Sequence, residues 1–181
     1  MNICVFCSSH TDLPNPIVET AKGLGCLIGR LGGTLVYGGS KRGLMEITAQ
    51  AAKAAGARVV GVLPTYMICS GGASSYIDEQ IAVADLAERK QQMLARADVF
   101  VVLPGGVGTL DELMAVYAAS VVGEHKKPVY LLNVLHYWDP LIRVFDHFET
   151  SGTSRQGMFL KRITVVGSLE ELAHSLCSNG E

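Results

Sequence analysis

The sequence predicts a single α/β domain spanning residues 1–181, in which helices cover both faces of one doubly wound parallel β-sheet. Short apolar runs alternate with longer segments of helical periodicity along the chain. The composition of 49% hydrophobic residues, 7% aromatic residues and 20 glycines suits one packed domain with many tight turns. Small residues follow several of the apolar runs, as they do where parallel strands end beside a ligand.

The first third of the chain alternates strand and helix. A loop of turn-forming residues at 8–16 separates the first strand from the first helix, which three glycines weaken. Gly38-Gly39 end the second strand, Gly56 ends the alanine-rich second helix, and Pro64 ends the third strand. The predicted strands are 2–7, 34–37 and 58–63, and the predicted helices are 17–31 and 43–55. Strands joined through helices make right-handed crossovers and pair in parallel.

The alternation resumes after a predicted loop at 64–72 and a stretch at 76–83 whose periodicity is ambiguous. The remaining predicted strands are 99–103, 128–133 and 163–166, and the remaining predicted helices are 85–97, 109–122, 141–148 and a last helix from Ser168. No repeat or linker interrupts the pattern, so one Rossmann-like domain is the economical prediction.

Three loops of small residues should meet at one edge of this sheet, because the carboxyl ends of parallel strands lie together. They are Ser8-Ser9, Gly38-Gly39-Ser40 and Gly105-Gly106. Turn chemistry explains each of them alone. Their convergence predicts a ligand-binding edge, with Ser9, Gly39, Gly105 and Gly106 among the binding residues.

The third loop leads directly into a helix and predicts a phosphate site. Backbone N–H groups at a helix N-terminus have no intrahelical acceptor and favour anions. The loop is not a dinucleotide fingerprint, since Asp111 stands where the third glycine of G-x-G-x-x-G is needed. Neither this loop nor residues 38–43 has the lysine and hydroxyl residue that complete a P-loop. Glycine spacing therefore predicts an anion without identifying it.

Thr109 and Glu112 have a purely structural explanation. Thr-x-x-Glu is a capping box, in which the threonine side chain accepts a backbone N–H bond and the glutamate reaches back to the start of the helix. The spacing alone favours this explanation over a chemical role.

The predicted helix at 85–97 carries two cations close to its packing face. Leu86, Met93, Leu94 and Ala97 form the inward stripe of the helix. Lys90 falls inside this stripe and Arg89 near its edge. Such cations either extend to solvent along their apolar stems or meet an anion, and the phosphate edge of the adjoining strand offers one.

Charge and hydropathy exclude several classes of partner. The net charge is −2 and the basic pairs are scattered, which argues against a nucleic-acid partner. No apolar run approaches the roughly 18 residues of a membrane helix, and no signal peptide precedes the first strand, so we expect a cytoplasmic protein without a membrane partner.

The five cysteines are expected to be free thiols. Cys4 and Cys7 have C-x-x-C spacing, but no second pair completes a zinc site, and two such residues on one strand point to opposite faces. The histidines show no metal-binding spacing. We therefore predict no metal site, and packing explains the pair better than redox chemistry does.

Two linked motifs resemble those of a known family. Arg89-Lys90-Gln-Gln-Met93 and residues 104–112 resemble the R-K-x-x-M and P-G-G-x-G-T-x-x-E motifs of the Lonely Guy proteins, and residues 37–45 resemble their Y-G-G-G-x-x-G-L-M motif. Those proteins are cytokinin riboside 5'-monophosphate phosphoribohydrolases, long labelled lysine decarboxylases. The similarity also includes residues 4–7 and 127–133 and extends to about Phe148.

The resemblance implies hydrolysis of the N-glycosidic bond of a nucleoside 5'-monophosphate, giving free base and ribose 5-phosphate without a cofactor. It makes Arg89 and Glu112 the catalytic pair, so that capping becomes at most a concurrent role of Glu112. It also implies a homodimer formed through helices near the site. The residues implied to hold the nucleotide are Lys90, Gly106, Val107, Gly108 and Thr109.

Several positions depart from the family pattern, and the base is left open between a cytokinin and plain adenine. Family glycines are replaced by Ser8, Ser40 and Glu46, a ligand-contacting glutamate of the plant members by Tyr66, and a threonine by Ala118. The catalytic pair is retained.

Two other classes of protein remain as alternatives, a binding protein and a pyridoxal-phosphate decarboxylase. A binding protein of the same architecture, as the related molybdenum-cofactor carriers are, would not need the retained Arg89 and Glu112. A pyridoxal-phosphate decarboxylase would need the S-x-H-K motif, of which His125-Lys126 lacks the serine, and 181 residues are few for that fold.

Overall fold

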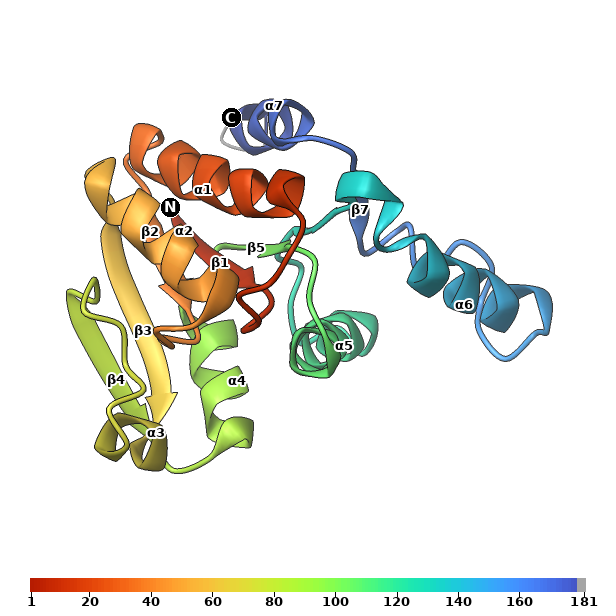
Figure 1. Cartoon of the computed structure of the whole chain (residues 1–181). Coiled ribbons are helices and arrows are strands. Elements are labelled where there is room, and N and C mark those ends of the chain that lie inside the picture. The colour runs from red at the N-terminus through yellow and green to blue at the C-terminus, as the bar shows by residue number, and fades with distance from the viewer. Residues whose placement is uncertain (179–181) are drawn as a thin grey trace.

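The computed structural model describes residues 1–178 and contains one sheet of seven parallel strands (Figure 1). The strand order is β4-β3-β2-β1-β5-β6-β7. The strands are β1 Asn2–Phe6, β2 Thr34–Tyr37, β3 Arg58–Pro64, β4 Glu79–Val83, β5 Val99–Val102, β6 Val129–Leu132 and β7 Thr164–Val166. The order runs outward from β1 to β4 and then returns to the other side of β1 at β5, so the predicted doubly wound fold is confirmed.

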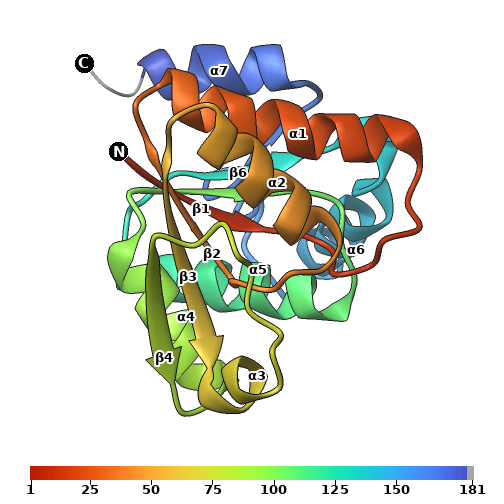
Figure 2. The same cartoon turned by 60° about the vertical axis from the view of Figure 1, so that its left-hand side comes forward.

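Helices cover both faces of the sheet (Figure 2). One face is covered by α1 Asn15–Arg30, α2 Gly43–Ala54 and α7 Leu169–Ser178. The other face is covered by α4 Leu86–Arg96, α5 Val107–Val121 and α6 Asp139–Thr150. Two short helices, α3 Thr65–Cys69 and the 3₁₀ helix η1 Val134–His136, connect strands to the next element.

Alternate residues of the central strands enter different hydrophobic cores. Ile3 and Val5 of β1 pack under α1 and α2, whereas Cys4 and Phe6 pack under α4 and α5. Because both of their faces are covered, the central strands are apolar without a polar side, which is why they appear in the sequence as continuous apolar runs.

The structure contains short elements that were not predicted, and it shifts the ends of some predicted ones. The predicted loop at 64–72 contains α3, and the ambiguous stretch at 76–83 contains the strand β4. β4 lies at the edge of the sheet, and only Val83 among its residues is fully buried, so its sequence carries little periodic signal. The helix predicted from Thr109 begins at Val107.

No helix among residues 1–178 is long and apolar enough to cross a bilayer. The predicted free thiols are confirmed, since all five cysteines are unpaired. Cys4 and Cys7 are buried in different cores, and burial raises the pKa of both thiols. This placement agrees with a packing role.

Candidate active site

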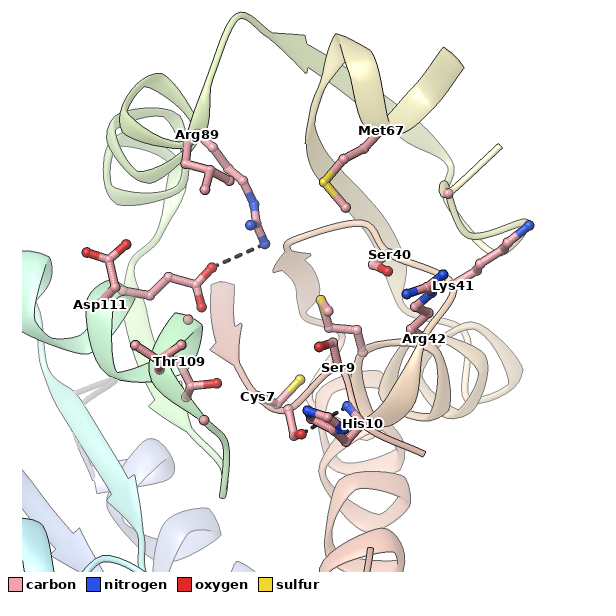
Figure 3. Close-up of a pocket in the computed structure, with 18 of the residues that line it drawn as sticks. Cys7, Ser9, His10, Ser40, Lys41, Arg42, Met67, Arg89, Thr109 and Asp111 are labelled. Atoms are coloured by element: carbon pink, nitrogen blue, oxygen red, sulfur yellow. Dashed lines mark hydrogen bonds and ion pairs between the residues drawn. The ribbon is translucent and has the colours of Figure 1, made fainter. Parts of the chain in front are cut away.

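A cavity of about 640 Å³ opens at the carboxyl ends of β1, β2 and β5. Its walls come from residues 7–10 after β1, the loop after β2, the segment after α3, one side of α4 and the first turns of α5. Figure 3 shows Arg89 and Asp111 on one side of it and Lys41 and Arg42 on the other. The cavity lies beside the point where the strand order reverses between β1 and β5, which is where sheets of this kind bind ligands.

The centre of one wall is a buried ion pair between α4 and α5. Arg89 Nη2 lies 3.1 Å from Glu112 Oε1, and only 14% and 11% of the two side chains are exposed. Both residues line the cavity, and Figure 3 shows the contact as a dashed line. The two motif residues, separated by 23 positions in the sequence, are therefore brought into direct contact where a ligand would lie.

Burial makes Glu112 an unusual carboxyl group. Desolvation raises its pKa to about 7, and this effect exceeds the opposing attraction of Arg89. The charge of Asp111 also contributes to this raised pKa, whereas the charge of Lys90 opposes it. Near neutral pH, Glu112 can therefore both hold and release a proton, as a group that exchanges protons with a ligand or a water must.

This raised pKa predicts a pH-dependent contribution to stability. Because folded Glu112 holds its proton more tightly than in the unfolded chain, the free energy of unfolding should fall between pH 4.5 and about 7. The fall should be at most about 3 kcal/mol. We expect Glu112→Gln to remove this component, as measured by urea unfolding of both proteins at pH 5 and pH 7.5. An equal fall in both proteins would contradict the prediction.

Lys90 makes a second ion pair one residue further along α4. Its Nζ lies 2.8 Å from both carboxylate oxygens of Asp111, and both residues line the cavity. The two cations predicted near the packing face of the helix thus both meet anions, but these anions are protein carboxylates. Sequence reasoning missed Asp111, although its position next to Glu112 in the helix would place it near Lys90.

The start of α5 excludes the capping box. Gly106 is the N-cap residue and no side chain caps this end, so Thr109 lies in the first turn and is buried. The carboxylate of Glu112 faces Arg89 instead of the helix start. A side-chain cap does occur at the start of α4, where the Asp85 carboxylate accepts hydrogen bonds from the N–H groups of Ala87 and Glu88 at 2.9 Å. The capping explanation for Thr109 and Glu112 is therefore wrong.

Most of the predicted binding residues surround the cavity. Those that line it are Ser9, Lys90, Gly106, Val107, Gly108 and Thr109. Gly39 and Gly105 do not. Gly39 has a φ of +69° and packs against Leu63. Gly105 leaves room for the side chain of Thr109. Both glycines therefore affect the conformation of the loops without lining the cavity.

Gly38 has a role that its motif alone did not show. A Cβ atom at this position would occupy the space of the Arg89 guanidinium. The absence of a side chain is therefore what lets Arg89 lie across the end of β2 and reach Glu112.

We expect Gly38→Ala to lower activity at least about tenfold by displacing Arg89, since misplaced catalytic groups lose much of their effect. The melting temperature should change little, because a flexible side chain can move away. Gly167→Ala is the matched control, as its Cβ would meet atoms only at ordinary contact distance. Equal steady-state rates for Gly38→Ala and the control would contradict the role.

Of the positions that depart from the family pattern, some line the cavity and others lie away from it. Ser8 and Ser40 both line the cavity. Ser8 also connects the loop after β5 to the first turn of α2, since its N–H donates to Pro104 and its carbonyl accepts from Leu44. Tyr66 is 59% exposed and lies outside the cavity wall, where its neighbour Met67 is found instead. Ala118 is exposed on α5 and Glu46 lies behind the wall on α2, and neither lines the cavity.

Several wall residues were not predicted as binding residues, although three of them, Lys41, Arg42 and Met45, lie within the motif at 37–45. No motif indicated the other two, His10 and Met67. They come from loops and helix ends whose approach depends on the tertiary structure. Lys41 and Arg42 make the side of the cavity opposite Asp111 cationic (Figure 3). Among residues 1–178, no group of three or more histidine, cysteine or acidic side chains is arranged to hold a metal ion.

Comparison with known proteins identifies relatives over most of the chain. A family model described as "Possible lysine decarboxylase" matches residues 45–176. The chain is 39% identical over 150 residues to a probable cytokinin riboside 5'-monophosphate phosphoribohydrolase of Oryza sativa subsp. japonica, covering 83% of this chain and 67% of the relative. It is 41% identical over 150 residues to a cytokinin riboside 5'-monophosphate phosphoribohydrolase of Arabidopsis thaliana, covering 83% and 69%.

Solved structures show the same fold at lower sequence identity. The molybdenum cofactor binding protein of Rippkaea orientalis superposes with a TM-score of 0.75 at 24% identity, covering 99% of this chain and 97% of that one. This likeness concerns the fold alone. The sequence relatives, the family match and the motifs at the cavity agree, and on this evidence the chain belongs to the Lonely Guy family.

Proposed function

We propose that this single-domain protein hydrolyses the N-glycosidic bond of a nucleoside 5'-monophosphate, releasing the free base and ribose 5-phosphate. The observation that carries the proposal is the buried Arg89–Glu112 pair in the wall of the cavity, beside the N-terminus of α5. The names of the sequence relatives support the same reaction.

The first turn of α5 suits the 5'-phosphate. The backbone N–H groups of residues 106–109 have no intrahelical acceptor. Gly106, Val107 and Gly108 have no bulky polar side chain that would cover these N–H groups. A phosphate bound there lies about one helical turn from Glu112 along α5, because side chains three to four positions apart share a helix face. The sugar attached to that phosphate can therefore reach the Glu112 carboxylate.

Glu112 suits the chemistry at the sugar. Breaking the glycosidic bond builds positive charge on the ribose, which a nearby carboxylate stabilises, and the same carboxylate can take a proton from the attacking water. Arg89 does not release a proton near neutral pH, so we assign it charge stabilisation and the orientation of Glu112. No cofactor takes part in this scheme.

Chromatography of the released base tests the proposal. We expect free adenine, or an N6-substituted adenine, from the 5'-monophosphate but not from the nucleoside without phosphate. If the ionised form of Glu112 acts, the rate should rise as pH increases through about 7. Tight nucleotide binding without base release would indicate a carrier protein instead.

The physiological base is the finer question. Met67 lies on the side of the cavity away from α5 (Figure 3), and Leu86 also lines the cavity. These apolar side chains fit an N6 substituent of cytokinin type. We therefore expect N6-isopentenyl-AMP to be cleaved with a lower KM than AMP. A panel of monophosphates with different N6 groups, measured under one condition, decides between them.

We also propose a cytoplasmic homodimer. Val107 lines the cavity, and Ala118 and Val122 are exposed further along α5 and directly after it. Such exposed apolar side chains suit contact with a second copy. Five free thiols suit a reducing compartment. Light scattering during gel filtration should give about twice the chain mass of 19.3 kDa.

A further inference from the structure

We infer that Tyr137 is a positioning residue that aims the phosphate-binding backbone of the loop before α5, an inference that rests on the proposed function. Tyr137 follows β6 and lies outside the cavity wall. Its hydroxyl donates a hydrogen bond of 2.7 Å to the carbonyl oxygen of Gly105, 32 residues earlier in the chain. This bond joins the segment directly after η1 to the loop that follows β5.

The bond fixes the orientation of one peptide group. The carbonyl of Gly105 and the N–H of Gly106 belong to the same planar trans peptide, so they point in opposite directions. Holding the carbonyl toward Tyr137, outside the cavity, turns the N–H of Gly106 the other way. Gly106 lines the cavity and precedes α5 as its N-cap, so this N–H has no intrahelical acceptor and is available to an anion.

Gly105 is held from both sides. The side chain of Thr109 occupies the space where a Cβ of Gly105 would be, and Tyr137 holds its carbonyl. Glycine backbones are flexible by themselves, so a loop of Pro104-Gly105-Gly106 needs such contacts to keep one conformation. A preorganised donor binds an anion more tightly than a mobile one, because no ordering is required on binding.

The segment that carries Tyr137 is itself constrained. Leu135 and His136 both have left-handed backbone conformations, with φ of 54° and 57°, which non-glycine residues keep only where their surroundings impose it. The side chain of Asn133 closes the turn by accepting the N–H of Trp138 and donating to Asp139, both at 2.7 Å. The Tyr137 ring also packs edge-on against Trp138, with centroids 4.9 Å apart. These contacts hold the Tyr137 hydroxyl within hydrogen-bonding distance of the Gly105 carbonyl oxygen.

Tyr137→Phe removes the hydroxyl and keeps the ring. We expect the Kd for ribose 5-phosphate, measured by calorimetry, and the KM for the 5'-monophosphate each to rise about tenfold, the scale of one weakened bond to a charged group. kcat should change less than about twofold, because the catalytic pair is untouched. Inhibition by free adenine, which has no phosphate, should be unchanged.

Tyr117→Phe is the matched control. Tyr117 lies on α5, its ring packs with Phe145 and Phe159, and it does not line the cavity. This variant should keep the wild-type Kd and KM, and thermal unfolding should show that both variants are folded. A purely structural role of Tyr137 would lower stability without changing Kd.

The outcomes separate this inference from the proposed function. Wild-type Kd and KM values in Tyr137→Phe would overturn the positioning role even if the protein releases base. A wild-type protein that binds ribose 5-phosphate but releases no base would overturn the hydrolase proposal, whereas a weaker Kd in Tyr137→Phe would still support the positioning role. Absence of ribose 5-phosphate binding by the wild type would overturn the anion site and the inference with it.

Discussion

Glu112→Gln should lower the rate of base release at least about a hundredfold, the usual effect of losing a general acid–base group. Glutamine has nearly the same shape and keeps an oxygen that can accept from Arg89, 3.1 Å away in the wild type. What it removes is the negative charge and the proton exchange made possible near neutral pH by the raised pKa of Glu112. KM should change much less than kcat, because the phosphate is bound elsewhere.

The fold should survive this substitution. Glu112 does not cap α5, since the helix begins at Val107, and the carboxylate makes its contact with α4. Glu124→Gln is the matched control, because Glu124 is an exposed carboxylate just beyond the other end of α5. Steady-state rates and melting temperatures should be measured for both variants. A folded Glu112→Gln protein with wild-type kcat would remove Glu112 from the mechanism.

Arg89→Ala should also lower the rate at least about a hundredfold, as expected when a preorganised charge is removed from a buried site. Arg89 is the main influence that lowers the pKa of Glu112, so its loss should raise that pKa from about 7 to a higher value. At neutral pH a smaller fraction of Glu112 would then be ionised. The variant should therefore recover part of its activity as pH rises, and its pH–rate profile should shift to higher pH than that of the wild type.

A matched control lies on the same helix. Arg96, near the end of α4, bonds to Gln92 and does not line the cavity, so Arg96→Ala should keep the wild-type pH profile. Arg89→Lys tests geometry, because lysine keeps the charge without the planar fork of the guanidinium. If Arg89→Ala lowered the rate equally at every pH, Arg89 would act on the substrate and not through Glu112.

Most of the fold could be predicted because the sheet is buried on both faces. Residues 35–37 and 99–103 are uninterrupted apolar runs ended by glycine or proline, and this composition has few alternatives in a chain of this size. Two elements were not predicted, because their packing produces little hydrophobic periodicity in the sequence. The edge strand β4 is mostly exposed, and α3 is too short for a helical pattern to appear.

The site was predictable in parts. The family motifs indicated Arg89, Glu112 and the glycine loop, and the cavity contains all three. Spacing alone favoured a capping box, because a capping box and a catalytic glutamate beside an anion site have the same local sequence. The position of the helix start decides between them, and that start depends on how the loop after β5 packs.

The sequence by itself determined the alternation of strands and helices, the edge at which small-residue loops gather, and the two motifs. These follow from local composition and periodicity, which each segment carries independently of the others. Only the tertiary structure decided that Gly38 makes room for Arg89, that Asp111 pairs with Lys90, and that Tyr137 holds Gly105. Each of these contacts joins segments far apart in the chain, so its existence depends on the strand order and on how closely the strand ends approach.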